Sequence, residues 1–158
     1  MIIGRNAILT ITTLAVLGSA ALAGGHLSGD QEKAMKVRNG HMQLYSFNLG
    51  ILGAMAQDKA PYDAAAAATA ATNLAAVASI SQDGYWVEGT DTSVEGSRAK
   101  PEIWTDFAGF EQDNADLGTA TVALAAVAGD GLDALKGAFG PVGKACGACH
   151  EDYRAPRE

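Results

Sequence analysis

The sequence contains few of the residues that several classes of protein depend on. Its 158 residues include only two cysteines, and aromatic side chains make up 6% of the chain. The 18 acidic residues outnumber the 11 Lys and Arg residues, so the formal net charge is −7. A chain without a basic stripe cannot neutralise many phosphates, and we therefore expect no nucleic-acid partner. The length suits a single domain.

Long apolar runs are also absent, except at the N-terminus. Residues 1–23 contain one basic residue, Arg5, followed by an apolar run and a small-residue end at Ala23. This order is typical of a secretory signal peptide, with cleavage after Ala23. A retained membrane anchor is the alternative, but the run is short and rich in threonine. We expect residues 24–158 to form one exported, periplasmic domain that has no membrane contact after cleavage.

Strand-like alternation and internal repeats are absent too, whereas helical patterns cover most of the domain. Helices are expected over 28–58 and 64–81, from Pro101 to the turn at 129–131, and over 132–154. Ser28 and Gln31 have the spacing of a capping box at the first helix. Pro141 should kink or restart the last helix, because proline lacks an amide hydrogen. A long loop rich in Gly, Asp, Ser and Thr separates the second and third helices. The expected fold is all-α, an antiparallel four-helix bundle.

Both cysteines stand in one short motif near the C-terminus, Cys146-Gly-Ala-Cys149-His150. A thioredoxin-like redox site would need a βαβ context, which is missing. A structural zinc site needs four ligands, and no second paired motif supplies them. A structural disulfide is possible in an exported protein, but it leaves His150 without a role. Covalent attachment of haem explains every residue of the motif.

The spacing of this motif has a physical reason. Residues three and four apart share one face of a helix, so Cys146, Cys149 and His150 point at one haem. The two sulfurs form thioethers with the haem vinyl groups, and His150 binds the iron. Gly147 and Ala148 are small and allow the helix to approach the ring. Export fits as well, because c-type haem is attached outside the bacterial cytoplasm.

The motif and its surroundings resemble the class II c-type cytochromes, the cytochrome c′ family and its low-spin relatives. The similar stretches are VRNGHM (37–42), APYDAA (60–65), KPEIW (100–104) and FGPVGKACGACHEDYR (139–154), which together span the mature chain. The resemblance implies one haem c near the C-terminus of a four-helix bundle, of which cytochrome c′ is itself a standard example. It also implies that the chain can form a homodimer.

The resemblance implies two states for the sixth coordination position of the iron. In the low-spin relatives a methionine of the first helix binds the iron, and the corresponding residue here is Met42, four residues after Arg38. A thioether raises the reduction potential and keeps the iron six-coordinate. We predict a one-electron carrier that serves redox partner proteins, with iron held by His150 and Met42. The alternative is a high-spin cytochrome c′ with an open distal site that binds NO or CO; a Met42 that only fills the core would fit this alternative.

The resemblance further implies contacts at the haem edge. Arg38 is expected to bind a propionate, since a guanidinium matches a carboxylate in fork geometry. Asn39 is expected to reach the haem edge. The stretch EGTD (88–91) lies where such cytochromes line the haem, which points to Thr90 and Asp91.

Two other residues of the first helix are expected to lie away from the haem. His41 points about 100° around the helix from Met42 and should lie at the surface or at an interface. Met35 is expected to fill the core. The sequence shows no catalytic nucleophile, acid–base pair or phosphate-binding loop, so we do not expect an enzyme.

Overall fold

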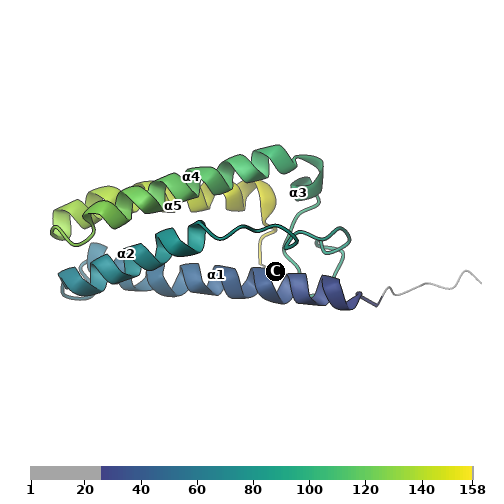
Figure 1. The fold of residues 1–158 in the computed structure, drawn as a ribbon, viewed down its shortest axis with the longest axis horizontal. Helices are drawn as coiled ribbons and strands as arrows, with labels where there is room; N and C mark the ends of the chain where they lie inside the picture. The colour runs from purple at the N-terminus through teal and green to yellow at the C-terminus, as the bar shows by residue number, and fades with distance from the viewer. Residues whose placement is uncertain (1–25, 158) are drawn as a thin grey trace, which may run out of the picture.

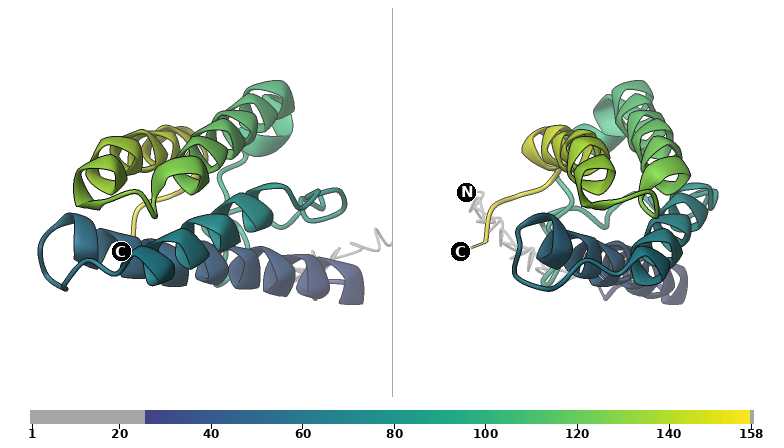
Figure 2. Two further views of the ribbon diagram at one scale, coloured as in Figure 1. Left: turned by 60° about the vertical axis from the view of Figure 1, so that its left-hand side comes forward. Right: turned by 90° about the vertical axis from the view of Figure 1, so that its left-hand side faces the viewer.

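The computed structural model describes residues 26–157 of the chain. This part contains four long helices and one short helix. They are α1 (Gly29–Ala56), α2 (Ala64–Ala78), α3 (Glu102–Thr105), α4 (Phe107–Val127) and α5 (Leu132–Tyr153). The long helices alternate in direction and surround one axis (Figures 1 and 2). The predicted antiparallel four-helix bundle is confirmed.

Two points concern export and the membrane: the predicted signal peptide, and whether any described helix could cross a bilayer. The predicted signal peptide, residues 1–23, lies outside the described residues and stays a prediction. Within residues 26–157, no helix combines the length and the apolar character needed to cross a membrane.

Side-chain caps set the starts of the first two helices. The side chain of Ser28 accepts a hydrogen bond from the Gln31 amide at 3.2 Å, and the Gln31 side chain accepts one from the Ser28 amide at 2.8 Å. The predicted capping box is therefore confirmed. At α2 the Asp63 carboxylate accepts from the Ala66 amide at 2.9 Å. These bonds satisfy amides that have no partner inside a helix.

The third predicted helix is divided at Asp106, so the prediction of one continuous helix is wrong. Asp106 has φ −131° and ψ 57°, outside the helical region, and its side chain accepts from the Gly109 amide at 3.2 Å. The hydroxyl of Tyr153 donates to the same carboxylate at 2.9 Å. A side chain that bonds nearby amides competes with the helix and ends it.

The last helix continues through Pro141, where a kink or a restart was expected. Pro141 is exposed, and the residue four positions earlier is Gly137, which is exposed as well. Pro141 has no amide hydrogen to donate to the Gly137 carbonyl, and because this carbonyl is near the surface it can turn toward water instead. Because α5 is continuous, the haem-binding motif lies on the same helix as residues that pack in the core.

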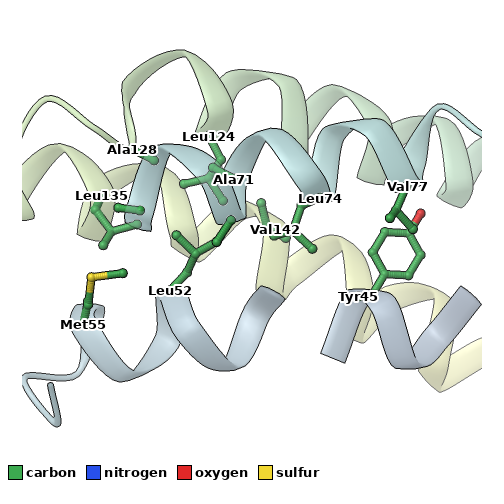
Figure 3. Packing of buried hydrophobic residues seen from close by; sticks show 12 residues of the cluster. Tyr45, Leu52, Met55, Ala71, Leu74, Val77, Leu124, Ala128, Leu135 and Val142 are labelled. Atoms are coloured by element: carbon green, nitrogen blue, oxygen red, sulfur yellow. The ribbon is translucent and has the colours of Figure 1, made fainter. Parts of the chain in front are cut away.

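The core lies between α1, α2, α4 and α5 and consists mainly of Leu and Ala. Leu52, Leu74, Leu124 and Leu135 are fully buried in it and face one another across the bundle (Figure 3). Ala67, Ala70 and Ala71 of α2 complete the cluster and allow the neighbouring helices to approach closely.

The two ends of the bundle differ. At one end the hydroxyl of Tyr62 donates to the Ala128 carbonyl at 2.9 Å and accepts from the Gly131 amide at 3.0 Å. This residue joins the α1–α2 connection to the α4–α5 connection. Toward the other end, the α4–α5 pair diverges from α1, and the loop between α2 and α3 lies there (Figure 1).

Candidate cofactor site

A cleft of about 610 Å³, including the open solvent at its mouth, lies between α1 and α5. Its lining comes from α1, from the loop between α2 and α3, and from α3, α4 and α5. The apolar part of the lining consists mainly of Met35, Met42, Trp86, Ile103 and Phe110. This is the kind of largely apolar, concave site that binds a flat cofactor.

The C-terminal motif is part of this cleft. Cys149 and His150 line it, and Cys146 packs beside it against the main core. The α1 residues Arg38, Asn39 and Met42 line the same cleft, so the structure brings together these predicted site residues from the two ends of the chain. That these α1 residues contact a haem bound at the motif stays a prediction.

Burial controls the protonation of the motif. It raises the pKa of the Cys146 thiol, and it raises that of Cys149 to about 11, with nearby acidic groups adding to the effect on Cys149. Burial also lowers the pKa of His150, and the charges of Arg154 and Arg98 lower it further. His150 is therefore neutral at physiological pH, and a neutral imidazole has a lone pair available for a metal.

Arg38 is buried, with 7% of its surface exposed, although it carries a charge. Its two terminal nitrogens donate to the hydroxyl and to the carbonyl of Thr90, at 2.9 and 3.1 Å. Its guanidinium lies 4.8 Å from the ring centroid of Trp86, in a cation–π contact. Burial lowers the pKa of Arg38. Arg38 therefore attaches the loop to α1 at the edge of the cleft.

Thr90 and Asp91 are not part of the cleft lining. Thr90 is fully buried behind Arg38, and its hydroxyl donates to the Val87 carbonyl at 2.6 Å. Asp91 accepts from the Ser93 amide at 2.7 Å, and this hydrogen bond lowers its pKa. The structure thus gives Thr90 a positioning role through Arg38 and gives Asp91 a role within the loop.

Two expectations about α1 are wrong. His41 is only 5% exposed, and its ring lies 5.0 Å from Tyr45 and 5.9 Å from Tyr85, centroid to centroid. Met35, expected in the core, lines the cleft. The buried face of α1 has helical spacing, but polar residues occupy several of its positions. Helical spacing that includes polar residues identifies this face, whose buried residues are Ala34, Arg38, His41, Tyr45, Asn48, Leu52, Gly53 and Met55.

Two buried polar atoms bear on whether a haem fits this site. Within the described residues, Nε2 of His41 and the hydroxyl of Tyr45 have no hydrogen-bond partner. Burial raises the pKa of Tyr45 to about 12, and Cys146 and Cys149 contribute to the rise. An unsatisfied buried polar atom costs about 1–3 kcal/mol. Neither residue lines the cleft, so the fit of a haem rests on the donors that do.

The set of donors in the cleft fits a covalent haem c. The two thiols match the vinyl groups, the neutral imidazole of His150 matches the iron, and the apolar walls match the ring. Arg38 supplies a cation at the edge of the cleft for a propionate. The residues present therefore fit the cofactor that the motif predicts.

We predict that Thr90→Val weakens the fold by about 1–3 kcal/mol, because it removes the hydroxyl that accepts from Nη1 of Arg38 and leaves that buried donor without an acceptor. Valine has a similar volume, so packing changes little. The free energy of unfolding in urea measures the loss, with Thr92→Val, an exposed substitution in the same loop, as the control. Equal stability of the two variants would show that the bond between Arg38 and Thr90 contributes nothing.

Comparison with known proteins gives consistent matches. The model of a family described as "Cytochrome C'" matches residues 33–154. The cytochrome c′ of Cereibacter sphaeroides is 36% identical over 151 residues, which cover 95% of this chain and 98% of that protein. The cytochrome c-554 of the same species is 40% identical over 124 residues, which cover 78% of this chain and 93% of that protein.

Solved structures give the same result. A cytochrome c′ from Rhodobacter sphaeroides superposes with a TM-score of 0.79 at 36% identity, covering 82% of this chain and 100% of that one. A nitric oxide complex of a leucine-to-alanine variant of cytochrome c′ from Alcaligenes xylosoxidans has a TM-score of 0.71 at 34% identity, covering 83% and 100%. A cytochrome c′ described by its ligand-controlled dimer dissociation has a TM-score of 0.73 at 32% identity, covering 84% and 100%.

Proposed function

The chain belongs to the cytochrome c′ family, whose members carry one covalently bound haem c, and we propose that its haem iron has an open distal side that binds NO or CO. One observation carries this proposal. The α1 wall of the cleft offers Met35, Arg38, Asn39 and Met42, and therefore no nitrogen ligand comparable to His150. In this proposal Met42 lines the distal side without binding the iron, so the sixth position is free for a diatomic ligand.

The residues of the chain have separate tasks in this proposal. Cys146 and Cys149 would hold the haem covalently, and His150, kept neutral by burial and by neighbouring arginines, would bind its iron. The apolar walls exclude water, while Arg38 places a cation at the propionate edge. When bound, the haem supplies reversible one-electron chemistry and a site for a diatomic ligand. The relative whose solved structure is a nitric oxide complex supports this assignment.

A second candidate function is one-electron transfer with Met42 bound to the iron. The observation that favours it is the position of Met42 on α1, in the lining of the same cleft as His150. Met42 is 39% exposed, and thus not held in the core as Met55 is. A bound thioether would raise the reduction potential and close the distal side.

Optical spectra of the holoprotein, ferric and ferrous, before and after addition of CO, distinguish the two functions. For an open distal side we expect a broad high-spin ferric spectrum and a CO-induced shift, both unchanged in Met42→Leu. The control is Met55→Leu, a substitution of a buried methionine on the same helix. A methionine–iron charge-transfer band that disappears in Met42→Leu alone, together with no response to CO, would establish the second candidate instead.

We further propose that the protein is periplasmic, as its predicted signal peptide indicates.

We also propose that it forms a homodimer along α1. The solvent-facing side of α1 carries Val37, Leu44 and Phe47, and Phe47 is 69% exposed. Large exposed apolar side chains on one helix favour association with another protein surface. The exposed residues of α2 are mainly Ala and Thr, so α2 offers less apolar surface for a dimer than α1 does. A relative with ligand-controlled dimer dissociation supports a dimer.

A further inference from the structure

We propose that a basic rim beside His150, formed by Arg98, Lys100 and Arg154, docks an acidic electron-transfer protein that reduces the haem. The inference rests on the haem of the proposed function, but it does not depend on whether the distal side is open. Either state of the iron needs an electron donor, because CO binds ferrous iron and a carrier must be reduced in each cycle.

The rim surrounds a hollow on the outer side of the cleft. Arg98, Lys100 and Arg154 line this hollow together with His150 and one carboxylate, Glu151. The hollow is therefore a direct approach to the residue that holds the iron. A protruding carboxylate of a partner would meet three cations there.

Backbone carbonyls hold two of the rim cations in place. Nε of Arg98 donates to the Ala155 carbonyl at 2.9 Å. Nζ of Lys100 donates to the carbonyls of Glu151 and Asp152, at 2.8 and 3.1 Å. The carbonyl end of a helix favours cations, which explains why they gather at the end of α5. Carbonyls carry no full charge, so these hydrogen bonds do not neutralise Arg98 and Lys100, and both can still attract a carboxylate of a partner.

No carboxylate neutralises the rim by an ion pair within residues 26–157, where the two ion pairs join Lys33 to Asp30 and Lys136 to Asp58. The positive charges of the rim affect the pKa values of neighbouring groups. Arg154 contributes to the lowered pKa of Arg98, and both arginines contribute to the lowered pKa of His150, in each case after the larger effect of burial.

The charge of this chain is segregated rather than uniform. Asp113 of α4 has a raised pKa, first because of burial and then because of Asp152, Asp116 and Asp106. The hydrogen bond from Tyr153 to Asp106 holds the start of α4 against the end of α5, so the carboxylates of Asp106, Asp113 and Asp116 lie on the α4 side of that end, in a chain of net charge −7. An acidic partner would be repelled by those carboxylates and attracted to the rim, which orients its approach toward His150.

The proposed step moves one electron and no atoms. One electron passes from the reduced iron–sulfur or flavin centre of the acidic donor to the ferric haem, which becomes ferrous while the donor returns to its oxidised form. The rim contributes orientation and local concentration, and these determine the rate of productive encounter.

The test is the rate at which reduced plant-type [2Fe–2S] ferredoxin, an acidic protein, reduces the ferric holoprotein at increasing ionic strength. Both proteins are negative overall, so net charge alone predicts that salt raises the rate. We expect the opposite, a fall of about tenfold between about 10 and 200 mM salt. Arg154→Gln and Lys100→Gln should each lower the low-salt rate several-fold and flatten the salt dependence. Lys59→Gln, a matched loss of charge in the α1–α2 connection, should leave both unchanged.

Two controls separate docking from changes at the haem. Neutral lumiflavin semiquinone, which gives up one electron and one proton, should reduce Lys100→Gln and Lys59→Gln at the wild-type rate, because neither lysine lines the cleft. Oxidised ferredoxin added to the oxidised holoprotein should shift NMR signals of the rim, with weaker binding in Lys100→Gln than in Lys59→Gln.

A wild-type rate that rises with salt would overturn the proposal, as would equal behaviour of Arg154→Gln and Lys59→Gln. Rim signals that respond to inorganic phosphate but not to ferredoxin would replace it with a small-anion site. Failure of the proposed gas binding would be seen separately, in the CO spectra, which do not involve the rim.

Discussion

Changing both cysteines of the motif to serine, Cys146→Ser with Cys149→Ser, is expected to remove all covalently bound haem. Thioethers form only from thiols, and this chain has no cysteine outside the motif. The two thiols lie on one helix beside the cleft, so no other side chain can replace them. The mass of the denatured protein and a haem-stained denaturing gel measure the result, after expression with a c-type maturation system.

The single variants and a control make the test specific. Cys149→Ser and Cys146→Ser should each retain at most one thioether and give a shifted reduced spectrum. Ala148→Gly changes an exposed residue between the two cysteines and keeps their spacing, so it should retain the full covalent mass. Covalent haem in the double variant would contradict the assignment of the motif.

Leu52→Ala is expected to lower the free energy of unfolding of the holoprotein by about 2–5 kcal/mol, the largest loss of stability among the substitutions considered. Leu52 is fully buried and packs in the centre of the bundle near Ala71, Leu74 and Val142 (Figure 3). Removing its side chain leaves a cavity that four helices share and cannot easily close. Urea unfolding followed by circular dichroism measures the loss.

The control for this substitution lies on the outside of the bundle. Val122 of α4 is 62% exposed, so Val122→Ala should change stability by less than about 0.5 kcal/mol. If both variants lost the same free energy, the change would reflect helix propensity rather than core packing. A small loss in Leu52→Ala alone would mean that the core described above can collapse around the missing side chain.

Local interactions explain which features could be predicted from the sequence. The capping box at Ser28 joins residues three positions apart, and the haem-attachment motif lies within five consecutive residues. Helical periodicity likewise depends on neighbours three and four positions away, and it was enough to predict the bundle. The division at Asp106 was missed because a second contact, from Tyr153, comes from 47 residues away.

The sequence by itself therefore determined the all-α bundle and the covalent haem site, since both depend on short spacings along one chain. Only the tertiary structure decided what surrounds that site. Arg38 meets Thr90 across 52 residues, and Arg98 meets the C-terminal segment because Ala99 pairs with Arg154. Such contacts depend on how helices and loops pack in three dimensions, and no local spacing encodes them. The contact between Arg38 and Thr90 at the cleft and the basic rim beside His150 both arise from this three-dimensional packing.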